Sequence, residues 1–338
     1  MFEKSVSRRA VLGWTGAAAG AGLLGFPGKA GAQQTLRYGH MNSPTSNAGL
    51  QAQWFAEEVA RTTGGEIAIN VYPSSQLGKI RELAAGVSTG TIALSHNTAG
   101  AISALSESFA ALDTPYLYRD VDHLMKVVDI DSPVMQMLNE RLVADSGVRV
   151  LYAFYFGTRQ LTADREIKRP SDLEGVKIRA IPSPIYLATV EGLGAVPVPV
   201  DWSEVPTALA TGVVSGQENP VNVVLDNKLF DVQSHMMLTG HIQGAELVLI
   251  NDSTWQSFSS DVQSAVQEAA SVVRERASQS VLDGEASNLQ ALKDEGMTII
   301  GPDEGLDLEA FQASVKARID AEFAEQYGDL YQQIEAIG

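Results

Sequence analysis

The chain has 338 residues, with 24 lysines and arginines, 41 aspartates and glutamates and no cysteine, for a formal net charge of -17 at pH 7. Nucleic acids and anionic lipids repel so acidic a surface, and the lack of cysteine excludes disulfides, a thiol nucleophile and a zinc-thiolate site. The length exceeds what one hydrophobic core usually needs, which favours two lobes.

The first 32 residues have the pattern of an export signal. A pair of arginines, Arg8 and Arg9, precedes an apolar run rich in glycine and alanine that ends at Phe26, and small residues up to Ala32 supply a cleavage site. The run is shorter than the ~20 apolar residues of a membrane span. The pattern predicts a twin-arginine signal that is cleaved after Ala32 on export to the periplasm. Val11 stands where such motifs usually have phenylalanine, so the general secretory route stays open.

Short strands and helices alternate after the signal. A strand at 35–40 precedes a helix at about 46–63, which Gly64 and Gly65 end. The other elements predicted in this half are a strand at 67–72, a helix at 79–87, a strand at 92–95, helices within 122–146 and a long strand at 148–156 that could cross between lobes.

The second half continues this alternation. In a strand at 176–181, Arg179 points away from the face of Ile178. The remaining predicted elements are a helix capped by Ser183 with Pro184 at its first position, a helix capped by Ser203 that ends at Gly212, a long helix from Asp261 toward Gly296 that could span both lobes as a spine, a strand at 297–300 and a helix at 306–334. The pattern predicts an α/β fold with open, largely parallel β-sheets flanked by helices, where ligands bind beyond the carboxyl ends of strands.

Two arginines and an amide stand at strand or loop edges: Arg159, Arg179 and Asn219. No lysine or arginine occurs from Ala180 to Asn227, so the basic residues are not spread evenly along this part of the chain. A guanidinium presents a planar fork of donors that matches a carboxylate. The set therefore predicts a binding site for a small organic anion, without a cofactor or a metal. Arg179 could instead pair with a structural carboxylate, and Asn219 could only support the turn before Pro220.

Other motifs are weaker. The run from Gly86 to Gly90 matches the G-x-S-x-G motif of hydrolases around Ser88, but a predicted helix precedes the serine where that motif needs a strand. His235 and His241 lack metal-ligand spacing and are expected to be structural.

Several ordered blocks resemble the extracytoplasmic solute-binding proteins of tripartite ATP-independent periplasmic (TRAP) transporters. They are Tyr72 to Gly78, Leu112 to Tyr116, Gly157 to Gln160, Gly175 to Arg179 and Thr211 to Pro220, and they extend over nearly the whole mature chain. The resemblance implies a two-lobed periplasmic binding protein with hinge strands, which closes around an organic acid and delivers it to membrane permease subunits. It implies a monomer that carries out no reaction.

The resemblance also assigns roles to single residues. Arg179 would form a salt bridge with the ligand carboxylate, Arg159 would be a second arginine facing it, and Asn219 would hydrogen-bond the ligand. Asn42 would supply an amide from the loop after the first strand, and Trp202 would pack over the ligand, although Asn42 could be only a turn residue and Trp202 only core. Asn97, in the run His96-Asn97-Thr98, is a further candidate contact. The chain departs from the family pattern at Pro206, usually tyrosine, and Ser215, usually aspartate, which is expected to change local packing.

Residues 33–156 plus about 245–284 are expected to form lobe I, and 157–244 plus about 285–338 lobe II. The expected ligand is a sugar acid, such as a uronate or an aldonate, or a C4-dicarboxylate. The alternatives are an exported α/β hydrolase and an ABC-type or sensor-associated binding protein, which would share the fold but not these blocks.

Overall fold

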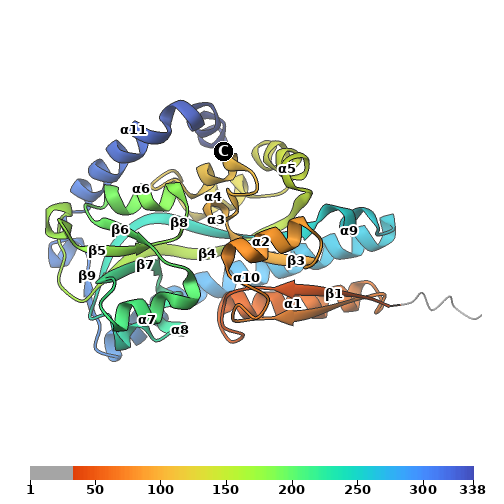
Figure 1. Cartoon of the computed structure of the whole chain (residues 1–338), viewed down its shortest axis with the longest axis horizontal. Coiled ribbons are helices and arrows are strands. Elements are labelled where there is room, and N and C mark those ends of the chain that lie inside the picture. The colour runs from red at the N-terminus through yellow and green to blue at the C-terminus, as the bar shows by residue number, and fades with distance from the viewer. Residues whose placement is uncertain (1–32) are drawn as a thin grey trace, which may run out of the picture. The chain divides into compact units, whose positions relative to one another are not determined.

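The computed structural model describes residues 33–338, so the predicted export signal lies outside the described residues. They form a mixed α/β structure in which one sheet is covered by helices on both faces (Figure 1). None of the helices within 33–338 is long and apolar enough to cross a membrane.

Nine strands make up the sheet. They are β1 (Gln34–Gly39), β2 (Ile67–Tyr72), β3 (Leu94–Thr98), β4 (Val148–Ala163), β5 (Lys177–Ala180), β6 (Val196–Pro199), β7 (Gly216–Pro220), β8 (His235–Asn251) and β9 (Thr298–Ile300). Their order is β2-β1-β3-β8-β4-β7-β5-β6, and β9 pairs with β8.

The α-helices are α1 (Asn47–Thr62), α2 (Ile80–Ser88), α3 (Ala99–Ile102), α4 (Val121–Val127), α5 (Pro133–Ser146), α6 (Pro184–Gly192), α7 (Val205–Ala210), α8 (Val221–Asp226), α9 (Asp252–Gln256), α10 (Ser260–Asp294) and α11 (Leu308–Glu335). Short 3-10 helices are η1 (Glu107–Asp113), η2 (Pro170–Leu173), η3 (Trp202–Glu204), η4 (Leu229–Asp231) and η5 (Pro302–Glu304).

The long strands β4 and β8 cross the middle of the molecule and make the fold two-lobed (Figure 1). They pair antiparallel with each other, with β3 on one side and with β7 on the other, whereas β2-β1-β3 and β7-β5-β6 are parallel groups. The predicted α/β fold with open β-sheet flanked by helices is confirmed, and most strand pairings are parallel as expected. A single mixed sheet runs through both lobes, and its antiparallel pairings are those of the crossing strands β4 and β8.

Three register shifts interrupt the pairing of β4 with β8, and one of them lies at Gly157. Shifts of this kind bend a strand and increase its twist. Gly157 has a φ of 125°, and a Cβ atom there would lie 2.6 Å from Cβ of Pro220. Only glycine fits this position, so the sequence favours a bend of β4 at Gly157.

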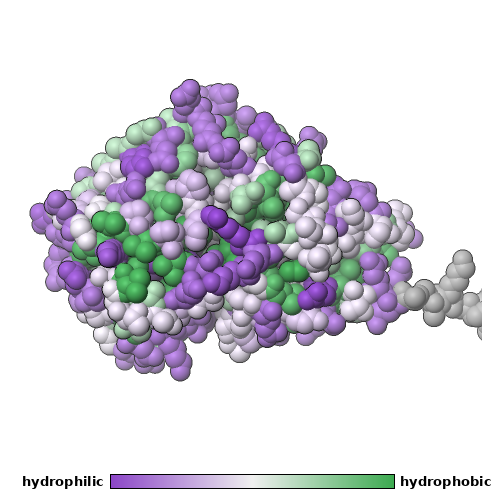
Figure 2. Space-filling view, in the orientation of Figure 1, coloured by the Kyte–Doolittle hydropathy of each residue, from purple (hydrophilic) through white to green (hydrophobic). Residues whose placement is uncertain are grey.

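Separate hydrophobic clusters cover the two faces of the sheet. One joins α5, α6 and α11 to one face, and a second joins α1 and α10 to the other. The predicted spine helix is confirmed as α10, 35 residues long, which packs against both α1 and α8. On the face in Figure 2, apolar residues form small patches interrupted by hydrophilic ones.

Some predicted boundaries need correction. The strand predicted at 92–95 is β3 at 94–98, and β4 extends beyond 156 to Ala163. Ser203 does not cap a helix, because η3 runs directly into α7 and places Glu204 at the cap. Ser183 does precede α6, but its hydroxyl makes no capping hydrogen bond.

Candidate functional site

A cavity lies where the carboxyl ends of β1, β3, β5 and β7 meet the crossing strands β4 and β8. All six residues predicted from the sequence line it: Arg179, Arg159, Asn219, Asn42, Trp202 and Asn97. The wall also includes Glu246, Thr98 and Phe156. The cavity volume is ≈ 30 Å³, enough to hold ordered water.

Arg179 is a buried cation without an anionic partner among residues 33–338. Its side chain is 1% exposed, and its only hydrogen bond to a described residue runs from Nε to the carbonyl oxygen of Val200, at 2.9 Å. The guanidinium carbon lies 5.8 Å from the centre of the Trp202 ring, within cation-π range. Burial lowers the pKa of Arg179 to about 10, and nearby Arg159 adds to this, despite the opposing charge of Glu218. Both terminal nitrogens are therefore available to an anion that enters the cavity.

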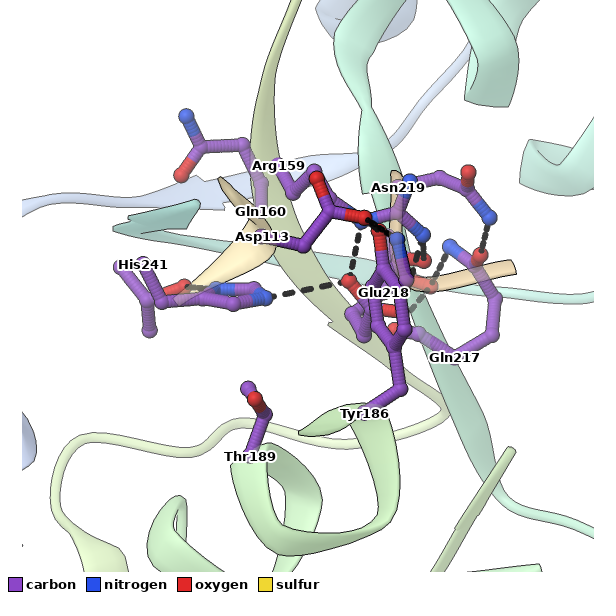
Figure 3. Close-up of polar contacts among 12 residues, drawn as sticks. Asp113, Arg159, Gln160, Tyr186, Thr189, Gln217, Glu218, Asn219 and His241 are labelled. Atoms are coloured by element: carbon purple, nitrogen blue, oxygen red, sulfur yellow. Dashed lines mark hydrogen bonds and ion pairs between the residues drawn. The ribbon is translucent and has the colours of Figure 1, made fainter. Parts of the chain in front are cut away.

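Arg159, in contrast, already forms an ion pair with a carboxylate of the protein, that of Glu218. Its Nη2 donates to the Oε1 atom of Glu218 at 2.9 Å, and its Nε donates to Oε2, so the two side chains form a bidentate pair (Figure 3). His241 Nε2 lies 3.1 Å from the same Oε2 atom. Burial alone would raise the pKa of Glu218, but attraction to Arg159 and the hydrogen bond from His241 outweigh burial and lower this pKa to about 2. The charge of Arg159 is thus neutralised by Glu218, whereas that of Arg179 is not neutralised by any residue within 33–338.

A second buried carboxylate, that of Asp113, is hydrogen-bonded to both α3 and α6. Asp113 accepts from the backbone N–H of Gly100 at 2.6 Å and from the hydroxyl of Tyr186 at 2.9 Å. The Tyr186 ring lies under the guanidinium of Arg159, 5.2 Å from its central carbon. Burial raises the pKa of Asp113 to about 6, although these two hydrogen bonds oppose the increase. Through Tyr186, helix α6 therefore contacts both Asp113 and the Arg159 ion pair.

A chain of hydrogen bonds orients Asn219. Its Nδ2 donates to Oε1 of Gln217, whose Nε2 donates to the hydroxyl of Thr162 at 2.9 Å (Figure 3). Thr162 lies 3.1 Å from Oε1 of Gln233. One hydrogen of the Asn219 amide is therefore engaged, and the other, together with Oδ1, stays available on the cavity wall.

The amide of Asn42 is oriented in a similar way. Gln51 Nε2 donates to the Tyr38 hydroxyl at 3.1 Å, and this hydroxyl lies 2.8 Å from His96 Nδ1. His96 Nε2 lies 2.9 Å from Oδ1 of Asn42. Because Oδ1 of Asn42 can only accept, the proton of the imidazole is on Nε2 and is donated to Asn42, and Nδ1 accepts from the Tyr38 hydroxyl. The Nδ2 group of Asn42 is left to face the cavity.

Two acidic residues of this site were missed from the sequence. Glu218 stood inside a recognised block but had no assigned role. Glu246 lines the cavity and interrupts an apolar stretch of β8, Ala245-Glu246-Leu247-Val248-Leu249-Ile250. A single carboxylate next to a buried apolar run was a signal that could have identified it.

The rival motifs have structural explanations. Ser88 ends helix α2, and its hydroxyl donates to the carbonyl oxygen of Ser146 at 2.6 Å, unlike the exposed serine of a hydrolase elbow. His235 lies 2.7 Å from the Ser234 hydroxyl, and His241 is hydrogen-bonded as described. Within residues 33–338, no group of three or more histidine and acidic side chains is arranged to hold a metal ion.

Comparison with known proteins gives matches over most of the chain. A family model described as bacterial extracellular solute-binding protein, family 7, matches residues 38–326. A solute-binding protein of Roseobacter denitrificans is 32% identical over 294 residues, covering 87% of this chain and 88% of that protein. The 2,3-diketo-L-gulonate-binding periplasmic protein of Escherichia coli is 31% identical, covering 94% and 96%. The C4-dicarboxylate-binding periplasmic protein of Rhodobacter capsulatus is 30% identical, covering 78% of each.

Solved structures have the same fold. A TRAP periplasmic solute binding protein from Roseobacter denitrificans with bound L-galactonate has a TM-score of 0.83 and 31% identity, and the match covers 89% of this chain and 98% of that one. Another, from Polaromonas and bound to D-erythronate, has a TM-score of 0.83 and 30% identity, with 90% and 98% covered. On this family match, these relatives and this fold, the chain belongs to family 7 of the bacterial extracellular solute-binding proteins, the periplasmic receptors of TRAP transporters.

Proposed function

We propose that Arg179 anchors the ligand of this receptor by binding the carboxylate of a sugar acid or a C4-dicarboxylate. The observation that carries this proposal is the buried guanidinium of Arg179, which has no anionic partner among residues 33–338 and lines the cavity. Burying an uncompensated charge costs several kcal/mol, and a bidentate ligand carboxylate recovers this cost.

The ligands of related proteins support this class. L-galactonate and D-erythronate occupy two of the similar structures, and two relatives are described as binding 2,3-diketo-L-gulonate and C4-dicarboxylates. Each of these molecules is a small carboxylic acid, so they share the group that a guanidinium recognises.

The other wall residues have supporting roles in this proposal. Asn42 presents its Nδ2 group and Asn219 its free amide hydrogen and Oδ1, while Trp202 packs against both Arg179 and the ligand. Arg159 adds positive potential, but Glu218 holds most of its donors, so it is a weaker contact than Arg179. Asn97 contributes to the wall from β3.

Capture requires the lobes to move. The wall residues Arg179, Asn97 and Glu246 are at most 3% exposed, so entry of a ligand requires opening, and closure then excludes water and strengthens the ion pair. In our proposal the moving lobes comprise 33–156 plus about 245–284 and 157–244 plus about 285–338, with the bend of β4 at Gly157 as part of the hinge. The mature receptor is exported by the twin-arginine route, acts as a monomer and carries out no reaction on its ligand before the permease takes it up.

The test uses the mature chain, residues 33–338, in a thermal-shift screen against organic acids, followed by calorimetry. A bound acid should raise the melting temperature by mass action. Arg179→Ala should abolish this shift while leaving the circular dichroism spectrum unchanged, whereas Arg141→Ala, an arginine outside the cavity, should keep it. Unchanged affinity in Arg179→Ala would contradict the assignment. Recovery of every bound acid unaltered after long incubation tests the lack of turnover.

A further inference from the structure

Glu246 is a buried carboxyl group in the cavity wall that the described part of the chain leaves without a hydrogen bond. It is 2% exposed, and its position in β8 pairs with Thr98 of β3 and Phe154 of β4. Its Oε2 atom accepts no hydrogen bond from any of the described residues. Buried polar groups almost always have a partner, so an unpartnered carboxyl facing a ligand cavity indicates that the ligand supplies one.

A neighbouring histidine, His96, cannot satisfy this carboxyl group. His96 Nε2 lies 3.4 Å from Oε2 of Glu246, but its hydrogen is directed to Asn42, 2.9 Å away. The other imidazole nitrogen accepts from the Tyr38 hydroxyl. Burial, with a further contribution from His40, lowers the pKa of His96, which keeps the ring neutral and unable to neutralise Glu246.

Glu246 and Arg179 face the same side of the sheet from different strands. Ile178 and Ala180 of β5, and Ala245 and Leu247 of β8, belong to the cluster on the face of α6. Side chains alternate along a strand, so Arg179 and Glu246 both project to the opposite face. Their strands are three positions apart in the sheet, on the order of 14 Å at ~4.8 Å per strand. A ligand held at its carboxylate by Arg179 thus extends toward Glu246.

The surroundings of Glu246 disfavour another negative charge. Burial raises its pKa to about 8, with the charge of Arg159 opposing this shift and that of Asp113 adding to it. A second ligand carboxylate there would be buried without a free cation, because Arg159 is already paired with Glu218, at a considerable cost in binding free energy. A ligand hydroxyl, by contrast, donates a hydrogen bond to the carboxyl oxygen whether or not Glu246 is ionised.

We propose that Glu246 determines the specificity of this receptor: it accepts a hydrogen bond from a hydroxyl group of the ligand and excludes a second carboxylate. The ligand is then a hydroxylated monocarboxylic acid of the aldonate type, and not a dicarboxylate. This inference rests on the proposed role of Arg179 as the carboxylate anchor.

Two pairs of acids that differ in a single group test the proposal. Erythronate and meso-tartrate differ only in a terminal hydroxymethyl or carboxylate group, and L-galactonate and galactarate differ in the same way. Calorimetry on the mature chain should show that the better-bound monoacid has a Kd at least about tenfold lower than its matched diacid.

Variants at Glu246 then assign the preference to this residue. At about pH 9, above the pKa of about 8, Glu246 is ionised. There Glu246→Gln removes the charge and places an amide donor beside the diacid, so the diacid should bind about tenfold more tightly while the monoacid changes by less than about fivefold. Glu246→Leu removes the acceptor and should weaken the monoacid by about tenfold or more. Glu191→Gln, on the outer side of α6, where Glu191 pairs with Arg318, should leave every Kd within about twofold.

Each outcome decides a separate point. Equal binding within each pair, a preference for diacids, or a preference that survives Glu246→Gln would overturn the inference and leave the role of Arg179 intact. If no organic acid binds the wild-type chain, the proposed function fails as well. The wild-type comparison needs no variant, so the preference remains testable even if a variant fails to fold.

Discussion

Arg159 and Glu218 form a bidentate ion pair across the adjacent strands β4 and β7, with at most 1% of either side chain exposed. The Nη2 group of Arg159 also donates to the backbone carbonyl oxygen of Glu218, at 2.8 Å. This pair separates the roles of the two arginines of the site. Arg159 is held by the protein itself, and in our proposal Arg179 is the cation that binds the ligand.

Loss of Glu218 should destabilise the protein strongly. Glu218→Gln leaves the Arg159 guanidinium buried without its counter-ion, which typically costs about 3–5 kcal/mol in the free energy of unfolding. Urea denaturation of the mature chain measures this change. Asp320→Asn, at an exposed pair with Lys316 in α11, is the control and should change stability by less than about 1 kcal/mol. A loss below that value in Glu218→Gln would contradict the structural role of the pair.

The same pair should make stability depend on acid pH. The pKa of Glu218 is about 2 in the folded chain against an ordinary 4.5, so the unfolded chain takes up the proton first. The stabilisation is therefore present above pH 4.5 and is lost as pH falls toward 2, on the order of 3 kcal/mol in total. Urea midpoints from pH 6 to 2.5 would show a steeper decline in the wild type than in Glu218→Gln. Parallel curves would mean that the carboxylate is not held by Arg159.

Arg179→Lys should bind the ligand poorly although it keeps the charge. An ammonium group cannot present two parallel donors to a carboxylate, and it cannot lie over Trp202 as a flat guanidinium does. We expect affinity to fall by about tenfold or more in calorimetry. Near-normal affinity in this variant would show that charge alone, and not bidentate geometry, holds the ligand.

The sequence identified the parts of this site that depend on local pattern. Arg179 and Asn219 each occupy the penultimate position of a short strand, and the helical spacing from Asp261 to Gly296 predicted α10. Such features are encoded by neighbouring residues. Resemblance to the family then assigned roles that the local pattern alone left open.

The partners of the site residues could not be predicted in this way. Glu218 lies 59 positions from Arg159, and their contact depends on the register of β4 against β7. The orientation of Asn42 depends on His96 and Tyr38, which come from different strands. Register and strand order arise from packing across the whole sheet, so neither was visible in any single segment.

An ion pair beside the cavity should slow release of the ligand. Lys79 Nζ lies 2.7 Å from Oε1 of Glu204. Lys79 directly precedes the cavity residue Ile80, and Glu204 lies in the same short 3-10 helix as the cavity residue Trp202. In our proposal Lys79 belongs to one lobe and Glu204 to the other, and both side chains are about half exposed, so the pair should give a modest, salt-sensitive stabilisation of the closed form. Stopped-flow measurements on Glu204→Gln should show dissociation faster by about two- to fivefold at low salt. At about 0.5 M salt, which screens exposed charges, the variant and the wild type should dissociate at the same rate. A difference that persists at high salt would exclude an electrostatic origin.

Glu246 should have the opposite effect on stability from Glu218. Its pKa rises to about 8 in the folded chain because of burial, whereas the ordinary value is 4.5. Between these values the folded chain holds a proton that the unfolded chain has lost, so stability falls as pH rises from 4.5 to 8, by at most about 1.4 kcal/mol per pH unit. Below pH 4.5 both states are protonated and this cost is absent.

Glu246→Gln should therefore be more stable than the wild type at neutral and alkaline pH. The amide does not titrate, so the difference in unfolding free energy between variant and wild type should be small at pH 4.5, increase up to about pH 8 and then level off. Urea denaturation without ligand at pH 5, 6.5 and 8 measures it, with Glu191→Gln as the control that should follow the wild type. A variant that loses stability, or a difference independent of pH, would show that Glu246 has a favourable partner within the protein. A stabilised variant with altered ligand preference is the result expected of a residue kept for binding at a cost in stability.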